Sequence, residues 1–271
     1  MQKTVLAAIG IVFMGGVFAG LLVAGSIMAP RVPAPDKDEL YSVSTINALA
    51  LGVYSGVTPV SELGNHGDLG IGTFDALDGE LIMLDGGTWQ VRSDGIPRRT
   101  DANLTTPWAV MTWFEPDIVI PVNGTTDLSG LTGLLDEALP SENLFYAVRI
   151  DGVFPAVRVR APFRQEKPYP PLVNATANQA VFNLSNTTGT IIGFYSPDYS
   201  SGLSVPGYHF HYLAKDRSSG GHVIGLTLGP GEVRADVTPR FAMVLPESGD
   251  FIGVDLSRDL GNEIAHVESG K

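Results

Sequence analysis

The sequence predicts a strand-rich α/β protein of the α+β type, in which a mixed-sheet domain precedes a smaller, β-barrel-like domain. Three observations support this class. Strand patterns recur around Asp-Gly turns, one clearly amphipathic helical segment spans residues 128–139, and a proline-rich stretch at 162–171 separates two strand-rich halves. Asp-Gly turns between such strands are typical of hairpins in antiparallel or mixed sheets. We therefore expect one α/β domain at residues 40–165 and a second, β domain at 166–271.

The elements expected in the first half begin with a short helix, because residues 41–51 carry apolar side chains at helical spacing. Residues 80–84 and 88–92 have strand patterns and flank Asp-Gly-Gly, which predicts a hairpin. Residues 108–114 are a further strand candidate. In residues 128–139 five leucines fall on one side, which predicts a helix that ends before the following proline.

The second half is expected to consist mainly of strands. Residues 145–150 and 153–160 are predicted to pair around an Asp-Gly turn, and in the latter Arg158 and Arg160 should face the same side. Residues 180–244 alternate short apolar runs with Gly and Pro turns, which predicts a β region without helices. A weak internal repeat relates residues 70–82 to residues 207–224 and indicates one similar hairpin in each half.

Composition excludes several classes of protein. The chain has 271 residues, of which 44% are hydrophobic and 17% charged, so it is globular rather than disordered. Its formal net charge of −12 repels phosphate backbones, and we expect no nucleic-acid partner. The sequence has no cysteine, so a metal ion must be held by imidazole and carboxylate groups.

The N-terminus predicts export. Residues 4–30 contain no charged side chain, and a helix of that length would span a ~30 Å hydrocarbon layer. Residues 1–30 are therefore either a signal peptide cleaved after the small residues Ala24 and Ser26 or a retained membrane anchor, which the Gly-xxx-Gly spacing at 16–20 favours. Residues 31–39 would form a proline-rich spacer. On this interpretation the protein is secreted or anchored, and only its N-terminal segment contacts the membrane.

Three of the five histidines predict a metal site. His209 and His211 lie two residues apart in a strand pattern, so both side chains should leave the same face about 6.8 Å apart. His222 follows a polar loop, and directly opposed residues of a hairpin lie about 5 Å apart. If His211 is opposite His222, three imidazoles can reach one ion and leave an open position, as in catalytic zinc sites. Spacing alone leaves zinc, copper, iron and nickel open; His66 and His266 receive no role.

A family resemblance extends from about residue 41 to the C-terminus. Residues 72–86 resemble the N-terminal signature of acetolactate decarboxylases. The segment 208–211 together with His222 is similar to the zinc motif of that family. Residues 157–160 occupy the place of the family's active-site arginine strand.

The resemblance implies a zinc-dependent enzyme that cleaves 2-acetolactate, a 2-hydroxy-3-keto acid, to acetoin and carbon dioxide and is typically a homodimer of two-domain subunits. Zinc would act as a Lewis acid toward the developing enediolate, and an arginine would hold substrate oxygens. A carboxyl group, from Glu80 or Glu268, would protonate the enediolate carbon or approach the metal as a further ligand. The resemblance further implies that the metal ligands are His209, His211 and His222. The other site residues that it implies are Thr73, Glu80, Arg160 and Glu268.

Two other functions remain open at this stage. A cupin-type oxygenase also uses a His-x-His strand with a later histidine. Such sites usually need a glutamate shortly after the pair, whereas the nearest acid here is Asp216, in a polar turn. The other alternative is an exported β domain without catalytic activity, whose metal ion is structural.

Overall fold

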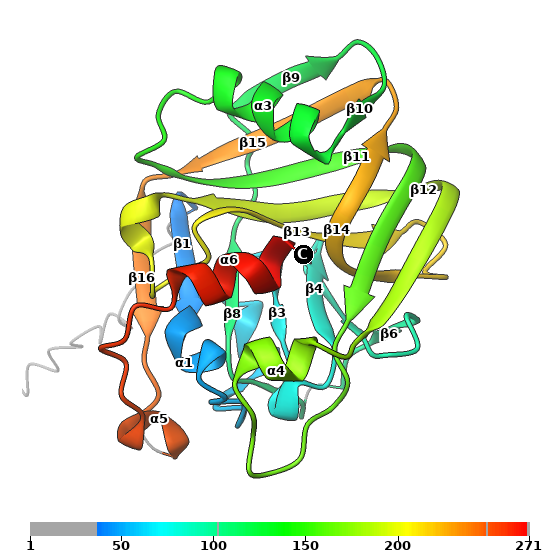
Figure 1. Cartoon of the computed structure of the whole chain (residues 1–271). Helices are drawn as coiled ribbons and strands as arrows, with labels where there is room; N and C mark the ends of the chain where they lie inside the picture. The colour runs from blue at the N-terminus through cyan, green and yellow to red at the C-terminus, as the bar shows by residue number, and fades with distance from the viewer. Residues whose placement is uncertain (1–36, 102, 248, 270–271) are drawn as a thin grey trace, which may run out of the picture. The chain divides into compact units, whose positions relative to one another are not determined.

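The computed structural model describes residues 37–101, 103–247 and 249–269, with two seven-stranded sheets (Figure 1). The expected signal or anchor at 1–30 and most of the spacer lie outside the described residues. Within the described residues, no helix has the length and apolar character needed to cross a membrane.

The first sheet is mixed, as predicted, because β1 runs parallel to β16 and antiparallel to β8. Its strands, in spatial order, are β16 (Arg240–Val244), β1 (Glu39–Val43), β8 (Ala109–Thr112), β3 (Leu69–Thr73), β4 (Glu80–Leu84), β5 (Gly87–Val91) and β6 (Pro97–Arg99). The helix expected at 41–51 is shorter than predicted. Ser44 has a positive φ of 61° and ends β1, and Thr45 then accepts a hydrogen bond from the Ala48 N–H, so α1 spans only Ile46–Ala50.

The second sheet is built around two 17-residue strands that pair with each other. Its order is β10 (Thr126–Asp127), β14 (Gly220–Leu228), β13 (Gly207–Ala214), β12 (Ala180–Ser196), β11 (Phe145–Ala161), β15 (Gly231–Thr238) and β9 (Ile118–Val122). β11 also pairs with β14. The barrel-like form expected for the C-terminal part is not confirmed.

The two Asp-Gly dipeptides that were expected to turn hairpins, at 85–86 and 151–152, adopt different conformations. Asp85 and Gly86 have φ angles of 51° and 70° and turn the chain between β4 and β5, as predicted. The hairpin predicted at Asp151-Gly152 is wrong, because this dipeptide continues β11. Asp151 pairs with Thr190 of β12 on one side and with Glu232 of β15 on the other, and its carboxylate accepts a hydrogen bond of 2.7 Å from the Thr190 hydroxyl. Pairing on both sides keeps the dipeptide extended.

The boundary that the sequence placed between residues 165 and 166 falls in the connection between β11 and β12, two strands of one sheet. Strands from both halves of the chain form the second sheet, and β16 from the second half completes the first. Accordingly, the described residues group as one compact unit.

Helix α3 (Leu128–Ala138) covers the outer face of the second sheet, whereas α1, α4 (Leu172–Thr176) and α6 (Gly261–Ser269) lie at the opening between the two sheets (Figure 1). The predicted helix at 128–139 is confirmed as α3 (Leu128–Ala138), whose N-cap Asp127 accepts a 2.8 Å hydrogen bond from the Gly130 N–H. Residues 180–244 contain strands and one 3₁₀ turn, whereas the second half as a whole also has α-helices. The remaining elements are β2 (Thr58–Pro59), α2 (Val60–Leu63), η1 (Asp75–Leu77), β7 (Thr105–Thr106), η2 (Asp198–Ser200) and α5 (Asp250–Gly253).

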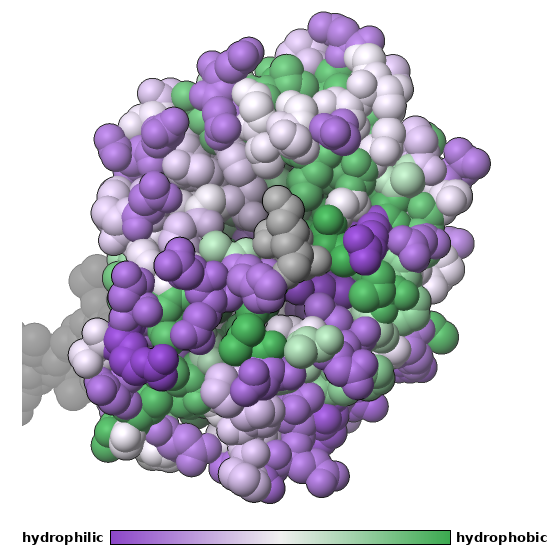
Figure 2. Space-filling view, in the orientation of Figure 1, coloured by the Kyte–Doolittle hydropathy of each residue, from purple (hydrophilic) through white to green (hydrophobic). Residues whose placement is uncertain are grey.

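The largest apolar cluster combines side chains of both sheets with side chains of α1, α4 and α6. Leu260 and Ile264, both 2% exposed, anchor α6 in this cluster. Over β11, β12 and β14 the visible surface is largely apolar, and elsewhere it is mostly hydrophilic (Figure 2). The fold therefore brings the C-terminal helix against strands of both sheets, where the predicted site residues lie.

Candidate metal centre

The three predicted ligands lie on one hairpin of the second sheet. β13 carries His209 and His211, β14 carries His222, and the strand register places His211 directly opposite His222. This confirms the pairing expected from the sequence. The imidazoles point toward the first sheet, where His211 Nδ1 lies 3.0 Å from the carbonyl oxygen of Leu81 in β4.

The ring nitrogens converge. Nε2 of His209 is 3.0 Å from Nδ1 of His222 and 3.2 Å from Nε2 of His211. Three nitrogens bound to one zinc ion at 2.0–2.1 Å would lie roughly 3.4 Å apart in tetrahedral geometry. The spacing of the donor atoms therefore fits a single ion, and the donor set, imidazole without thiolate, suits zinc or another divalent transition metal.

Backbone carbonyls fix the tautomers of two of the rings. A carbonyl only accepts, so His211 Nδ1–H donates to Leu81, and His222 Nε2–H donates to the carbonyl of Glu268 at 3.2 Å. The lone pairs of His211 Nε2 and His222 Nδ1 then face the cluster, as in metal sites where the second ring nitrogen is hydrogen-bonded to the protein.

The histidines are neutral, which is the state that binds metal. Burial lowers the pKa of His209 to about 3, and nearby Arg160 acts in the same direction. Burial likewise lowers the pKa of His211 and of His222 well below the ordinary value.

Two glutamates that are distant from each other in the sequence border the cluster. Glu80 begins β4 opposite Thr73, and its Oε2 lies 3.6 Å from His211 Nε2. Glu268 is near the end of α6, and its Oε2 lies 3.4 Å from His209 Nε2 and 3.7 Å from His222 Nε2. Both carboxyl groups are close enough to serve as proton carriers or as additional metal ligands.

Both carboxyl groups have raised pKa values. Burial raises the pKa of Glu80 to about 8; the charge of Glu268 acts in the same direction, and Arg160 opposes the shift. Burial also raises the pKa of Glu268 to about 7, again opposed by Arg160. Carboxyl groups with pKa values in this range can release and take up a proton near neutral pH, as general acid–base catalysis requires.

Arg160, at the end of β11, is only 4% exposed. Within the described residues no carboxylate lies at ion-pair distance from its guanidinium. Arg158, two positions earlier, is exposed, so burial separates the two arginines of the predicted strand. A buried guanidinium without a paired carboxylate is suited to bind an anionic ligand.

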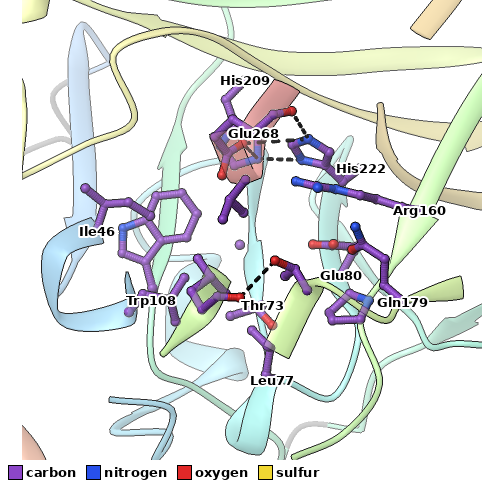
Figure 3. A pocket seen from close by; sticks show the side chains of 16 residues that line it. Ile46, Thr73, Leu77, Glu80, Trp108, Arg160, Gln179, His209, His222 and Glu268 are labelled. Atoms are coloured by element: carbon purple, nitrogen blue, oxygen red, sulfur yellow. Dashed lines mark hydrogen bonds and ion pairs between the residues drawn. The ribbon is translucent and has the colours of Figure 1, made fainter. Parts of the chain in front are cut away.

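These residues line one pocket between the sheets (Figure 3). The hydroxyl of Thr73 donates a 2.7 Å hydrogen bond to the Gly79 carbonyl and so stabilises the β3–β4 connection. The Trp108 ring stacks on His209, with centroids 5.8 Å apart and an angle of 10° between the planes. The fold therefore brings the predicted site residues together. The pocket is lined by Thr73, Glu80, Arg160, His209, His222 and Glu268. His211 is not part of the lining, but its Nε2 contacts Nε2 of His209.

The sequence did not identify every residue of the pocket. Trp108 was assigned only to a strand, and Gln179 follows α4 without any recognisable motif. Glu268 was found only through the family resemblance. The apolar wall also includes Ile46 and Leu49, which the sequence marked only as part of a helix, and Leu77, Leu172 and Val267, which no local pattern marked.

Comparisons with known proteins identify the family of the chain. A model of the alpha-acetolactate decarboxylase family matches residues 40–258. Alpha-acetolactate decarboxylases of Methanosarcina mazei and Bacillus subtilis are 49% and 39% identical to this chain; each match covers 85% of this chain, and 80% and 91% of the respective relative. The crystal structure of acetolactate decarboxylase from Bacillus subtilis subspecies spizizenii, 39% identical, matches with a TM-score of 0.83 over 85% of this chain and 100% of that chain. The chain belongs to the alpha-acetolactate decarboxylase family.

Proposed function

We propose that this chain decarboxylates 2-acetolactate to acetoin and carbon dioxide with the help of one zinc ion held by His209, His211 and His222. The observation that carries the proposal is the composition of one pocket. It combines three convergent neutral imidazoles, a buried arginine without a paired carboxylate and two carboxyl groups of raised pKa. Membership of the family supports the same reaction.

The donor set supports zinc. Three imidazoles with room for substrate oxygens correspond to the open, catalytic type of zinc site, and the nearby carboxylates are acceptable to zinc as further ligands. When bound, the metal supplies Lewis acidity toward oxygen atoms of the substrate.

Arg160 binds the substrate in this mechanism. Its guanidinium is charged at every relevant pH and presents a planar fork of N–H donors to substrate oxygens. Because the side chain is buried, the interaction takes place in a poorly solvated pocket, where charge–charge attraction is stronger than in water.

The reaction breaks the bond between C2 and the carboxyl carbon. Carbon dioxide leaves, the electron pair of that bond remains on the keto-alcohol fragment as an enediolate, and one proton must then be added to carbon. Glu80 and Glu268 both approach the histidine cluster within 4 Å, and the raised pKa of each favours its protonated form relative to an ordinary glutamate. A proton delivered from one fixed side would set the configuration of acetoin.

The two alternatives receive less support. A cupin-type site would need a carboxylate shortly after the histidine pair, but Asp216 is exposed in the β13–β14 loop and accepts hydrogen bonds from Ser218. A purely structural metal would have a closed ligand shell. The pocket instead borders the cluster with Arg160 and an apolar wall.

We also propose that the protein is exported and forms a homodimer. Export rests on the uncharged run at residues 4–30, and the dimer rests on the family resemblance. The intact chain should fractionate with membranes or be processed at its N-terminus, and the purified protein should sediment as a dimer. An unprocessed chain that stays in the cytosolic fraction would contradict export, and a monomer at micromolar concentration would contradict the dimer.

The decisive experiment measures metal content and acetoin formation on the same purified samples. We expect one zinc per chain and acetoin produced from 2-acetolactate, with both lost on treatment with a chelator and restored by zinc. Undiminished decarboxylation by protein shown to be metal-free would overturn the zinc assignment. Zinc-loaded protein without decarboxylase activity would overturn the proposed reaction.

A further inference from the structure

We propose that Gln179 is a substrate-binding residue that accepts a hydrogen bond from the tertiary hydroxyl of the substrate and so makes the site selective for 2-hydroxy-3-keto acids. The proposal rests on the proposed function above. Gln179 lies between α4 and β12, and its side chain lines the pocket beside Arg160 and Glu80 (Figure 3).

The position of Gln179 places it where a substrate must pass. It lines the inner pocket and also an outer hollow, and Arg160, Thr176 and Val267 line both as well. The outer hollow lies at α4 and α6, so the route to the histidines runs between these helices. Because the Gln179 side chain lines both the outer hollow and the inner pocket, it would contact a ligand bound in the inner pocket.

The amide oxygen of Gln179 has an unfulfilled hydrogen-bonding capacity. Oε1 is buried, yet within the described part of the chain no donor reaches it. Buried polar atoms are nearly always paired, because an unpaired one has lost its water without replacement. An unpaired acceptor at the wall of a ligand pocket therefore indicates a donor that arrives with the ligand.

The chemistry of the substrate identifies that donor. Ionised 2-acetolactate has a carboxylate, a ketone and a tertiary hydroxyl, and only the hydroxyl carries a hydrogen that can be donated. Arg160 offers donors alone and so suits the carboxylate. The acceptor of Gln179 is thus complementary to the hydroxyl, the group that distinguishes acetolactate from a simple 3-keto acid.

A site that hydrogen-bonds a hydroxyl discriminates against analogues without it, because its own polar group then stays unpaired. Loss of this acceptor should lower kcat/KM for acetolactate roughly 10- to 100-fold, the usual effect of one buried hydrogen bond in a charged site. The same change should leave 2-methyl-3-oxobutanoate, which lacks the hydroxyl, within about threefold of its wild-type value.

The test compares three variants of the full chain on these two substrates. Gln179→Met keeps the side-chain length but removes the acceptor, Gln179→Glu retains an acceptor, and Asn178→Met alters the exposed neighbouring amide as a control. Carbon dioxide release is corrected for the uncatalysed rate. Where the analogue is not turned over, its inhibition constant is measured instead. Zinc content and thermal unfolding are recorded on each sample.

We expect Gln179→Met to lose the preference for acetolactate while its zinc content stays at the wild-type level. Gln179→Glu should retain more of the preference than Gln179→Met, and Asn178→Met should resemble wild type. An unchanged preference in Gln179→Met, or equal losses on both substrates, would overturn the inference. Wild-type protein that fails to decarboxylate acetolactate would instead overturn the proposed function, so the two failures are distinguishable.

Discussion

Two regions of the molecule bury ionisable side chains, and they do so differently. In the pocket between the sheets, Oε2 of Glu268 and Nδ1 of His209 are buried without a hydrogen-bond partner among the described residues. At the end of β15, Asp236 is 1% exposed, but its Oδ2 accepts a 2.9 Å hydrogen bond from the backbone N–H of Glu115. Asp117 nearby similarly accepts from the N–H of Val237.

This difference distinguishes a site that binds ligands from a region that only stabilises the fold. Asp236 and Asp117 satisfy backbone donors and thereby join β15 to the segment before β9. The pocket leaves polar atoms unpaired in the protein alone, which costs stability and is consistent with a site completed by ligands. Substitutions in the pocket should therefore affect metal binding and turnover, and substitutions at Asp236 should affect stability.

The largest effect is expected from the metal ligands. His209→Ala, His211→Ala and His222→Ala should each lose tight zinc binding, because two imidazoles do not reproduce a three-ligand site. Loss of Lewis acidity is worth several kcal/mol, so turnover should fall about 10³-fold or more. Elemental analysis and acetoin formation are measured together.

The control for these variants is His66→Ala. His66 stacks on Tyr41 with ring centroids 3.6 Å apart, away from the pocket residues, and its loss should change neither zinc content nor turnover. A histidine variant of the cluster that keeps a full complement of zinc would contradict the ligand assignment.

A somewhat smaller effect is expected at Glu80. Glu80→Gln keeps the size of the side chain but removes the exchangeable carboxyl proton, so turnover should fall about 10²-fold, the lower end for general acid–base catalysis. Zinc content should remain, because three histidines are left. If zinc is lost together with activity, Glu80 acts chiefly as a ligand. Glu62→Gln, at an exposed position of α2, is the matched control.

At Arg160 we expect a fall of about 10- to 100-fold in kcat/KM on substitution by lysine, which keeps the charge but loses the planar fork. Zinc content should not change. Arg158→Lys, on the same strand but exposed, should stay close to wild type. Similar small effects at the two positions would argue against a substrate contact by Arg160.

The smallest effect on activity, and a distinct one on stability, is expected at Asp236. Burial, with the charges of Asp117, Asp38 and Glu115, raises its pKa from 3.8 to about 7. Between these values the folded chain holds a proton that the unfolded chain has released. The contribution of Asp236 to stability is therefore present at low pH and is lost as the pH rises toward 7, by about 1.4 kcal/mol per pH unit at most.

Asp236→Asn should remove this dependence. The free energy of unfolding, measured with denaturant between pH 4.5 and 7.5, should change less with pH in the variant than in wild type, while acetoin formation stays near the wild-type value. A difference between the two proteins that does not vary with pH would show that Asp236 does not titrate in this range.

The sequence by itself determined those features that depend on neighbours along the chain. The sequence spacing of His209, His211 and His222 was sufficient to predict that their side chains converge on one hairpin. Strand geometry places alternate residues on one face and brings directly opposed residues into contact. Likewise Asp85-Gly86 formed the turn expected of it, and the leucines of residues 128–139 formed α3. The two hairpins of the weak repeat, β3–β4 and β13–β14, are both present and both supply site residues.

Only the tertiary structure decided the features that depend on distant partners. Asp151-Gly152 stayed extended because β12 and β15 pair with it on both sides, and the expected domain boundary falls between strands of one sheet. Leu81 lies 130 positions from His211, yet its carbonyl fixes the histidine's tautomer. Glu268 and Gln179 enter the pocket from α6 and from the end of α4, and neither carries a local signal. Local periodicity in the sequence determines on which face of a helix or strand a side chain lies. The pairing and packing of segments distant in sequence determine which residues that side chain contacts.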